Sequence, residues 1–204
     1  MVYFSPSQDG SGDTGGKGGG AGGSSGGNFS NYTAISILGP TLISPEHLNK
    51  YAKSINPSAV ELGGLYVLYG DYYGIRGDIA FSQALLETGY FRFGGDVRST
   101  QNNFAGIGAT GTPVRGASFA TPEDGVLAHL QHLFAYASSE SLPTAYPVVD
   151  PRFHLVSRGT AKTWTALNGK WAVPGTTYGQ SILSIYGRII DFAVADLKAM
   201  RGRV

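Results

Sequence analysis

Glu87 is the residue of this sequence whose surroundings best suit acid–base chemistry. It lies in the run QALLETGYF, where helical spacing places it on one stripe with Ala80, Ala84 and Phe91. A carboxyl group among apolar neighbours loses hydration of its charged form, so its pKa rises and it can hold a proton near neutral pH. The pattern therefore indicates a general acid. The competing interpretation, which helical spacing alone favours, is a surface carboxylate paired with Arg92.

The histidines give weaker support for a metal site. His129 and His132 lie three residues apart on a predicted helix, and His154 is the nearest further imidazole. Catalytic zinc takes three protein ligands and keeps one position open, and the pattern H-E-x-x-H is absent. We therefore expect one surface histidine, one histidine packed against the core, and no metal.

Other familiar catalytic patterns are missing or incomplete. The 204-residue chain has no cysteine, which excludes disulfides, thiolate zinc sites and cysteine nucleophiles. No G-x-S-x-G supports a serine hydrolase. Residues Gly106–Gly111 satisfy G-x-G-x-x-G, but the dinucleotide pattern requires a preceding strand and a following helix, and here Pro113 follows almost at once. We expect a glycine-rich turn at this position and no cofactor.

The composition excludes two classes of partner. Lys plus Arg number 15 and Asp plus Glu 14, a net charge of +1, which leaves no electrostatic footprint for nucleic acid or an anionic membrane. No segment approaches the roughly 20 apolar residues of a membrane span. The N-terminal part also lacks the basic-then-apolar order of a signal peptide. We expect no membrane insertion, and either export by another route or a leader outside this sequence.

Glycine content divides the chain into two parts. The run GSGDTGGKGGGAGGSSGG begins at Gly10, and such a Gly/Ser segment behaves as a random coil with no side chains to bury. Residues 1–30 are therefore predicted to be a flexible tail or linker, and residues 31–204 a domain with its own core. A linker implies an attached module, whereas a solubilising tail or an appended leader fits the same composition.

Helical periodicity dominates the rest of the chain. Apolar spacing, N-cap residues and glycine stops predict helices over residues 44–54, 59–69, 78–91, 121–137, 160–168 and 178–200. Between residues 93 and 120, Gly, Asn and Thr with scattered apolar residues favour a small β lobe or hairpin. The predicted fold class is therefore α+β and predominantly helical, with Glu87 near the end of its helix.

Several separated motifs resemble one family of enzymes. They are LLETGYFRFGG, QNNFAGIGATG, ASFATPEDGVLAHLQHLFAYAS and the segments 150–153, 169–175 and 178–183. In this order, over roughly Pro45 to Ile190, they resemble bacterial and phage peptidoglycan hydrolases of the glucosaminidase type, glycoside hydrolase family 73. The resemblance implies a lysozyme-like fold with a helical lobe, a small β lobe and a cleft between them. It also implies cleavage of the β-1,4 bond after N-acetylglucosamine in cell-wall glycan.

The resemblance assigns roles to individual residues as well. Glu87 matches the family's catalytic glutamate, the proton donor to the glycosidic oxygen, and Tyr178 matches a tyrosine important for activity. The motif that lines the cleft beside the acid matches here at Asn102, Asn103, Phe104 and Gly106.

Aromatic residues fit a carbohydrate cleft because flat rings stack on sugar faces. We expect Phe104 and Tyr178 in the cleft with Trp171 as a further candidate, and Phe91 in the core. The implied partner is the glycan strand of peptidoglycan, and no cofactor is implied. The implied location is extracellular, in the cell wall, or on a phage, and the glycine-rich segment would then connect a wall-binding module.

A second carboxylate is harder to identify. Many relatives carry an acid in the hairpin, but residues 104–120 contain no Asp or Glu, and Glu123 and Asp124 are explained by the dipole of the following helix. Glycoside hydrolysis ordinarily uses two carboxylates, although a 2-acetamido group of the substrate can supply the nucleophile. We therefore favour Glu87 assisted by the substrate, with Asp96 as the runner-up for a second acid.

Two alternatives stay open at this point. A muramidase or a lytic transglycosylase would use the same glutamate on the other bond of the disaccharide. A non-catalytic module that binds peptidoglycan or has a structural role would explain the missing hairpin acid.

Overall fold

The computed structural model describes residues 35–95, 97–111 and 114–203, so the predicted tail over residues 1–30 and the candidate Asp96 lie outside the described residues. The α-helices are α1 (Pro45–Ile55), α2 (Gly63–Tyr73), α3 (Gly77–Glu87), α4 (Pro122–Ala137) and α5 (Tyr178–Arg201). Short 3-10 helices are η2 (Ser99–Gln101), η3 (Phe153–Leu155) and η4 (Trp164–Leu167). Strands β1 (Ala109–Gly111) and β2 (Val114–Arg115) form an antiparallel pair. The described residues are therefore predominantly helical with one small hairpin, which confirms the predicted α+β class.

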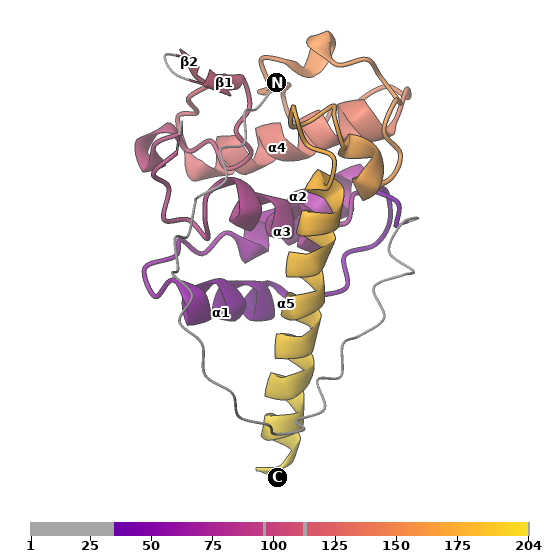
Figure 1. The fold of residues 1–204 in the computed structure, drawn as a ribbon. Coiled ribbons are helices and arrows are strands. Elements are labelled where there is room, and N and C mark those ends of the chain that lie inside the picture. The colour runs from indigo at the N-terminus through magenta and orange to yellow at the C-terminus, as the bar shows by residue number, and fades with distance from the viewer. Residues whose placement is uncertain (1–34, 96, 112–113, 204) are drawn as a thin grey trace, which may run out of the picture.

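The helices are stacked in tiers and crossed by the last one (Figure 1). α1, the α2 and α3 pair, and α4 lie one above another, and α5 runs across them with its C-terminal end projecting beyond α1. α3 is central, because it contacts α1, α2, α4 and α5. Its buried residues run from Gly77 to Leu85, so the helix that carries Glu87 is held on every side.

Local signals in the sequence explain where two helices begin. Ser44 caps α1 by accepting a hydrogen bond from the His47 amide, and Thr121 caps α4 in the same way from the Asp124 amide. A proline follows each cap, where a missing N–H costs nothing. These starts agree with the predicted ones, and α5 agrees along its whole length.

The predicted end of the third helix is wrong. α3 stops at Glu87 rather than at Phe91, because Thr88 turns its hydroxyl back onto the Ala84 carbonyl and accepts the Phe91 amide. Gly89 then adopts φ +56, and Tyr90 and Phe91 both adopt φ +59. This tight turn still carries Phe91 into the core, as expected, with 6% of its surface exposed.

Two further predicted helices need correction. α2 spans Gly63–Tyr73 rather than 59–69, and it ends where Gly74 takes the left-handed conformation at φ +64. The residues before Gly63 are not helical, because the chain turns there and the Ala59 amide donates to the Asn56 carbonyl at 2.8 Å. The predicted helix 160–168 contains only the 3-10 turn η4.

A buried acid fixes the start of α3. Asp78 is fully buried, and its Oδ2 accepts the amides of Leu42 and Ile43 at 2.9 and 3.2 Å and the Tyr186 hydroxyl at 3.0 Å. Its carboxylate thereby joins α3 to α5 and to the segment before α1. Asp78 is a structural residue that the sequence analysis did not identify.

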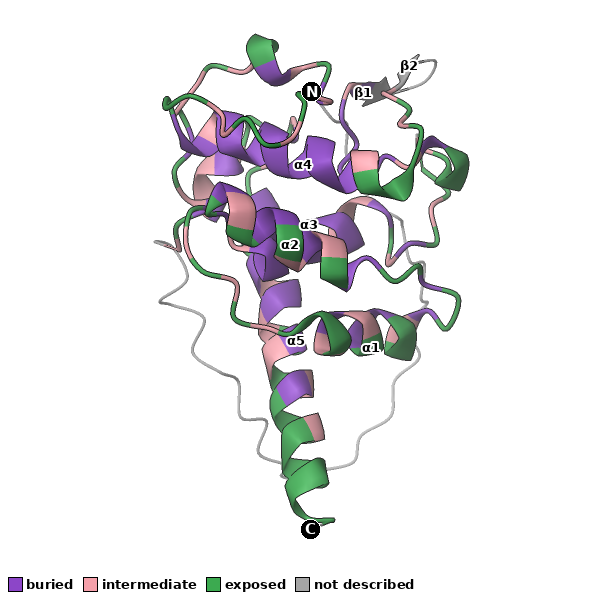
Figure 2. Ribbon diagram, turned by 180° about the vertical axis from the view of Figure 1, so that it is seen from behind, coloured by how far each residue is buried: buried purple, intermediate pink, exposed green. Residues whose placement is uncertain are grey.

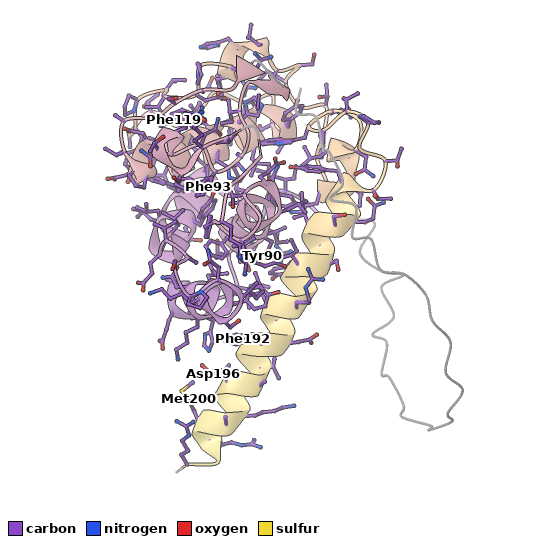
Figure 3. The ribbon with its side chains drawn as sticks, turned by 60° about the vertical axis from the view of Figure 1, so that its left-hand side comes forward. Tyr90, Phe93, Phe119, Phe192, Asp196 and Met200 are labelled. Atoms are coloured by element: carbon purple, nitrogen blue, oxygen red, sulfur yellow. The ribbon has the colours of Figure 1, made fainter. Side chains whose placement is uncertain are left out.

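Burial is uneven along the molecule (Figure 2). α3 and α4 are buried along most of their length, whereas the C-terminal half of α5 is largely exposed. On that half, Phe192, Asp196 and Met200 follow one another (Figure 3). Asp196 accepts a hydrogen bond from the Lys50 ammonium of α1 at 3.1 Å. Within the described part of the chain, no helix combines the length and apolar character that crossing a membrane requires.

Candidate active site

Glu87 is the last residue of α3, and its carboxyl group is enclosed by other side chains. Part of its surface remains exposed, yet burial raises the pKa of Glu87 from 4.5 to about 7. A hydrogen bond from Tyr178 and the nearby indole of Trp171 act in the opposite direction and limit the rise. Glu87 therefore exchanges a proton close to neutral pH, as a general acid must.

The surface pair between Glu87 and Arg92 does not form. The Arg92 guanidinium donates instead to the carbonyl oxygen of Ile55, the last residue of α1. The alternative interpretation that helical spacing favoured is therefore wrong. The buried-acid interpretation holds because the turn after Glu87 directs Arg92 away from the carboxyl group.

A chain of buried hydrogen bonds leads to the Glu87 carboxyl group. The Tyr178 hydroxyl donates to Glu87 Oε1 and accepts from Gln83 Nε2 at 2.8 Å. Gln83 Oε1 lies 3.0 Å from His129 Nε2, and His129 Nδ1 lies 2.9 Å from the Tyr66 hydroxyl. We call Tyr66, His129, Gln83 and Tyr178 the relay.

The chemistry of these side chains fixes which atom donates in each hydrogen bond of the relay. An amide oxygen only accepts, so the hydrogen of His129 is on Nε2 and points at Gln83. Burial lowers the pKa of His129 to about 3, so the ring is neutral and its Nδ1 accepts from Tyr66. Every donor therefore points towards Glu87, and the last one, Tyr178, has its hydroxyl hydrogen on the carboxylate.

Four helices contribute to this arrangement. Tyr66 comes from α2, Gln83 from α3 together with Glu87, His129 from α4, and Tyr178 from the first position of α5. Gln83 precedes Glu87 by four residues, so both project from the same face of α3. Sequence analysis identified Glu87 and Tyr178 but not the three remaining members. The spacing of four between a glutamine and the acid was the signal available for Gln83.

Tyr178 was expected to line the cleft, but its side chain is buried. Its side chain is 4% exposed, and its hydroxyl is fully engaged with Gln83 and Glu87. It therefore acts on Glu87 rather than on a sugar ring, and we describe it as a positioning residue.

Trp171 also lies next to Glu87 and is not a member of the relay. Its ring is 3% exposed and packs against those of His132, His129 and Tyr136, at centroid distances of 4.9, 5.6 and 5.6 Å. Its Nε1 is buried without a hydrogen-bond partner of ordinary geometry, although it lies close enough to Glu87 to lower the pKa of that group. This buried donor therefore serves the Glu87 carboxyl group.

A pocket of about 380 Å³ opens next to Trp171. The turn from Ala105 to Gly108 forms one wall, and His132, Tyr136 and Arg152 line others. Trp171 is thus shared between the pocket and the surroundings of Glu87. Among the residues predicted to bind substrate, Gly106 and Trp171 line this pocket.

The amides of the motif NNF shape the turn instead of facing the pocket. Asn103 is fully buried, and its Nδ2 donates to the carbonyl oxygens of Ile107 and Ala117, both at 3.0 Å. Its Oδ1 accepts the Ile107 amide at 2.9 Å. Asn102 is half-buried and donates to the Phe119 carbonyl at 3.0 Å. The structure therefore corrects the expected role of Asn103, whose polar atoms are all occupied within the protein.

Phe104 also lies away from the cleft. It is 2% exposed, and its ring packs against Phe91 and Phe93 at centroid distances of 6.0 and 6.3 Å. A Cβ at Gly125 of α4 would come within 3.2 Å of the Phe104 ring, which shows how closely the helix covers it. Phe104 is therefore a core residue and not a stacking platform.

The histidines are arranged differently from the expectation of one surface and one core residue. His129 is 0% exposed and His132 only 8%, with His132 Nδ1 at 2.7 Å from Asp150 Oδ2. Both are buried because α4 is covered on most of its faces. Within residues 35–95, 97–111 and 114–203, no three acidic or imidazole side chains gather as a metal site would need.

No other described carboxylate acts on Glu87, and none contributes to its raised pKa. Glu123 accepts the Tyr69 hydroxyl at 2.7 Å, and Asp124 is bonded to its cap Thr121. Both acids lie in the first turn of α4, where a negative charge interacts favourably with the helix dipole.

Comparisons with known proteins place the chain in a family. The family model described as Glucosaminidase, mannosyl-glycoprotein endo-beta-N-acetylglucosaminidase, matches residues 64–190. The matched region contains Glu87 and every member of the relay. An uncharacterized protein of Borreliella burgdorferi is 43% identical over 156 residues, which cover 74% of this chain and 75% of that protein.

Proposed function

The chain belongs to the glucosaminidase family, and we propose that it is an endo-β-N-acetylglucosaminidase that cleaves the β-1,4 bond after N-acetylglucosamine in peptidoglycan. Its mostly helical structure with one small hairpin is consistent with the lysozyme-like fold of that family. The family assignment makes the chain a glycoside hydrolase. The observation that carries the finer proposal is the Glu87 carboxyl group, with its pKa of about 7 and its hydrogen bond from Tyr178.

Glu87 would act first as the proton donor. Tyr178 occupies Oε1, which leaves the second carboxyl oxygen to carry the proton towards the glycosidic oxygen. At neutral pH, a group with a pKa of about 7 is protonated in a large fraction of molecules. As the bond from C1 to the leaving oxygen breaks, the proton passes to that oxygen and Glu87 becomes a carboxylate, which the Tyr178 hydroxyl stabilises.

The substrate would supply the nucleophile. The carbonyl oxygen of the 2-acetamido group attacks C1 as the leaving sugar departs, which gives an oxazolinium ring. Water then attacks C1, its proton returns to the Glu87 carboxylate, and the acetamido group is restored. The absence of any contribution to the Glu87 pKa from another described carboxylate supports this scheme. Asp96 remains the alternative second acid.

The relay would hold Glu87 in position through both steps. Because His129 is neutral and Gln83 bridges it to Tyr178, the Tyr178 hydrogen has no other acceptor among the relay residues than Glu87. A fixed donor requires little reorganisation when the carboxylate forms. Such an enzyme would work where peptidoglycan is found, outside the cell, in the wall or on a phage.

Analysis of products tests the proposed bond. Purified peptidoglycan is incubated with the protein, and the soluble fragments are reduced with borohydride and identified by mass spectrometry. Reduced N-acetylglucosamine ends are expected, and they should be absent with Glu87→Gln. Reduced N-acetylmuramic ends would indicate a muramidase, and anhydro ends a lytic transglycosylase. No release from several wall types, with binding retained, would indicate a non-catalytic module.

A further inference from the structure

The pocket beside Trp171 has a cationic wall. Arg152 and Lys170 both line it, and none of the residues that line it is acidic. Asp150 lies behind this lining, buried, where it is bonded to His132 and to the Arg152 backbone amide at 2.7 and 2.9 Å. The pocket therefore presents positive charge without a carboxylate of its own to neutralise it.

The Arg152 guanidinium has no protein partner in the part of the chain that the structure describes. The side chain is half-buried, yet it makes no hydrogen bond or ion pair with a described residue. It lies near the Tyr136 hydroxyl, since its charge lowers the pKa that burial otherwise raises in Tyr136. None of its nitrogens is enclosed by protein, so the guanidinium is free to form two parallel hydrogen bonds with a bound carboxylate.

Lys170 adds a second cationic donor to the same pocket. The Trp171 indole lines the pocket, but its Nε1 is enclosed by protein and acts on the Glu87 carboxyl group. The Lys170 ammonium donates to the Thr160 carbonyl at 2.6 Å, which leaves two of its three hydrogens for other acceptors. The pocket thus combines a guanidinium and an ammonium, two donors that each carry a positive charge.

We propose that this pocket binds a carboxylate carried by the muramyl unit of the substrate, with Arg152 as its main partner. The inference rests on the proposed function, because Trp171 places the pocket next to Glu87. N-acetylglucosamine has no carboxylate, whereas muramic acid carries one on its lactyl group when that group is free, and several on an attached stem peptide. The pocket would therefore favour peptidoglycan over uncharged glycans such as chitin.

Binding to three soluble probes tests the proposal. The full-length chain carries Glu87→Gln to prevent turnover, and dissociation constants are measured by calorimetry. The probes are chitin tetraose, a peptidoglycan tetrasaccharide with free lactyl groups, and the same tetrasaccharide with stem peptides. Arg152→Gln is the test variant, and Arg152→Lys keeps the charge. Arg201→Gln, at the far end of α5, is the matched control.

We expect Arg152→Gln to weaken binding of at least one acidic probe about tenfold and to leave chitin tetraose unchanged. The acidic probe that loses affinity identifies the lactyl group or the stem peptide as the source of the carboxylate. Arg152→Lys should retain part of the affinity, and Arg201→Gln all of it. Equal losses for all three probes, or no loss for any, would overturn the proposal.

A separate assay tests the proposed function: the release of fragments from peptidoglycan by the unsubstituted chain. If that chain releases no fragments but binding still depends on Arg152, the proposed hydrolase activity is rejected and the proposed carboxylate site is retained. Activity with binding that does not depend on Arg152 would do the reverse.

Discussion

On one side of Trp171 the polar side chains are buried and bonded to one another, and on the other side they face a pocket with partners missing. In the relay each residue from Tyr66 to Tyr178 is hydrogen-bonded to the next, and the last one donates to Glu87. The pocket wall has the unpaired Arg152 guanidinium and the Lys170 ammonium, which has hydrogens to spare. The contrast separates two tasks, since completed hydrogen bonds hold the acid and incomplete ones are available to the substrate.

The strongest way to break this contrast is to remove the acid itself. Glu87→Gln keeps the size of the side chain and an acceptor for Tyr178 but has no proton to transfer. We expect hydrolysis of peptidoglycan to fall about 1,000-fold. Glu123→Gln, an acid bonded to Tyr69 outside the relay, should keep activity near that of the unsubstituted chain. Comparable losses in both variants would mean that Glu87 has no special role.

Removal of the last relay hydroxyl should have the next largest effect. Tyr178→Phe deletes the donor that lowers the Glu87 pKa, so that pKa should rise further and the alkaline limb of the pH–rate profile should move to higher pH. The rate at its optimum should fall about 30-fold, because the developing carboxylate loses a hydrogen bond.

Tyr186→Phe is the matched control for this change. It removes a buried hydroxyl of the same helix, bonded to Asp78 at 3.0 Å. It should lower stability without moving the pH profile. A Tyr178→Phe profile that coincides with that of the unsubstituted chain would separate Tyr178 from the chemistry.

The middle of the relay can be tested through Gln83→Met. This variant leaves the Tyr178 hydroxyl without its donor and His129 Nε2 without its acceptor. We expect kcat to fall about tenfold with KM unchanged, and stability to fall by about 1–3 kcal/mol. Steady-state kinetics and thermal unfolding separate the two effects. Lower stability with kcat intact would make Gln83 purely structural.

The smallest expected effect is on the free energy of unfolding, which the buried Glu87 carboxylate lowers at high pH. The folded-state pKa of Glu87 is raised from 4.5 to about 7, so the folded protein binds this proton more tightly than the unfolded chain does. This contribution to stability is greatest below pH 4.5 and is lost as the pH rises towards 7. Glu87→Gln should therefore stabilise the fold at pH 8, by about 1–3 kcal/mol after allowance for its partial exposure, and little at pH 4.

Denaturant titration at the two pH values measures this difference. His129 titrates in the opposite sense, because its lowered pKa costs stability as the pH falls below 6.5, but it is present in both proteins and cancels in the comparison. Equal stability of the two proteins at pH 8 would show that the carboxylate is not held at a cost.

Sequence analysis was most successful where the signal is local. The caps at Ser44 and Thr121 and the long stripe of α5 predicted their helices. For Glu87, helical spacing alone favoured a surface carboxylate, and the resemblance of the motif around it favoured the buried acid. It failed at the end of α3, where four residues in a tight turn follow a helical pattern. The reason is that Thr88 and Gly89 stop the helix through bonds that periodicity does not show.

The rest of the site depends on contacts between distant residues. Nothing in the spacing of Tyr66, Gln83 and His129 along the chain shows that three helices bring them into one line. Phe104 and Asn103 belong to a motif that was expected to line the cleft, but which of its side chains turn inward depends on how α4 covers the loop. Motif resemblance locates a loop, and packing decides which of its side chains a ligand can reach.

The most direct test of the account is the pKa of Glu87 itself. The protein is prepared with ¹³C-labelled glutamate, and the side-chain carboxyl shift is followed by NMR from pH 3 to pH 9, with Glu87→Gln to assign the resonance. The account predicts a midpoint near the value of about 7 and an upward shift in Tyr178→Phe. A midpoint near 4.5, unchanged in Tyr178→Phe, would show that Glu87 is an ordinary carboxylate and would contradict its role as the general acid.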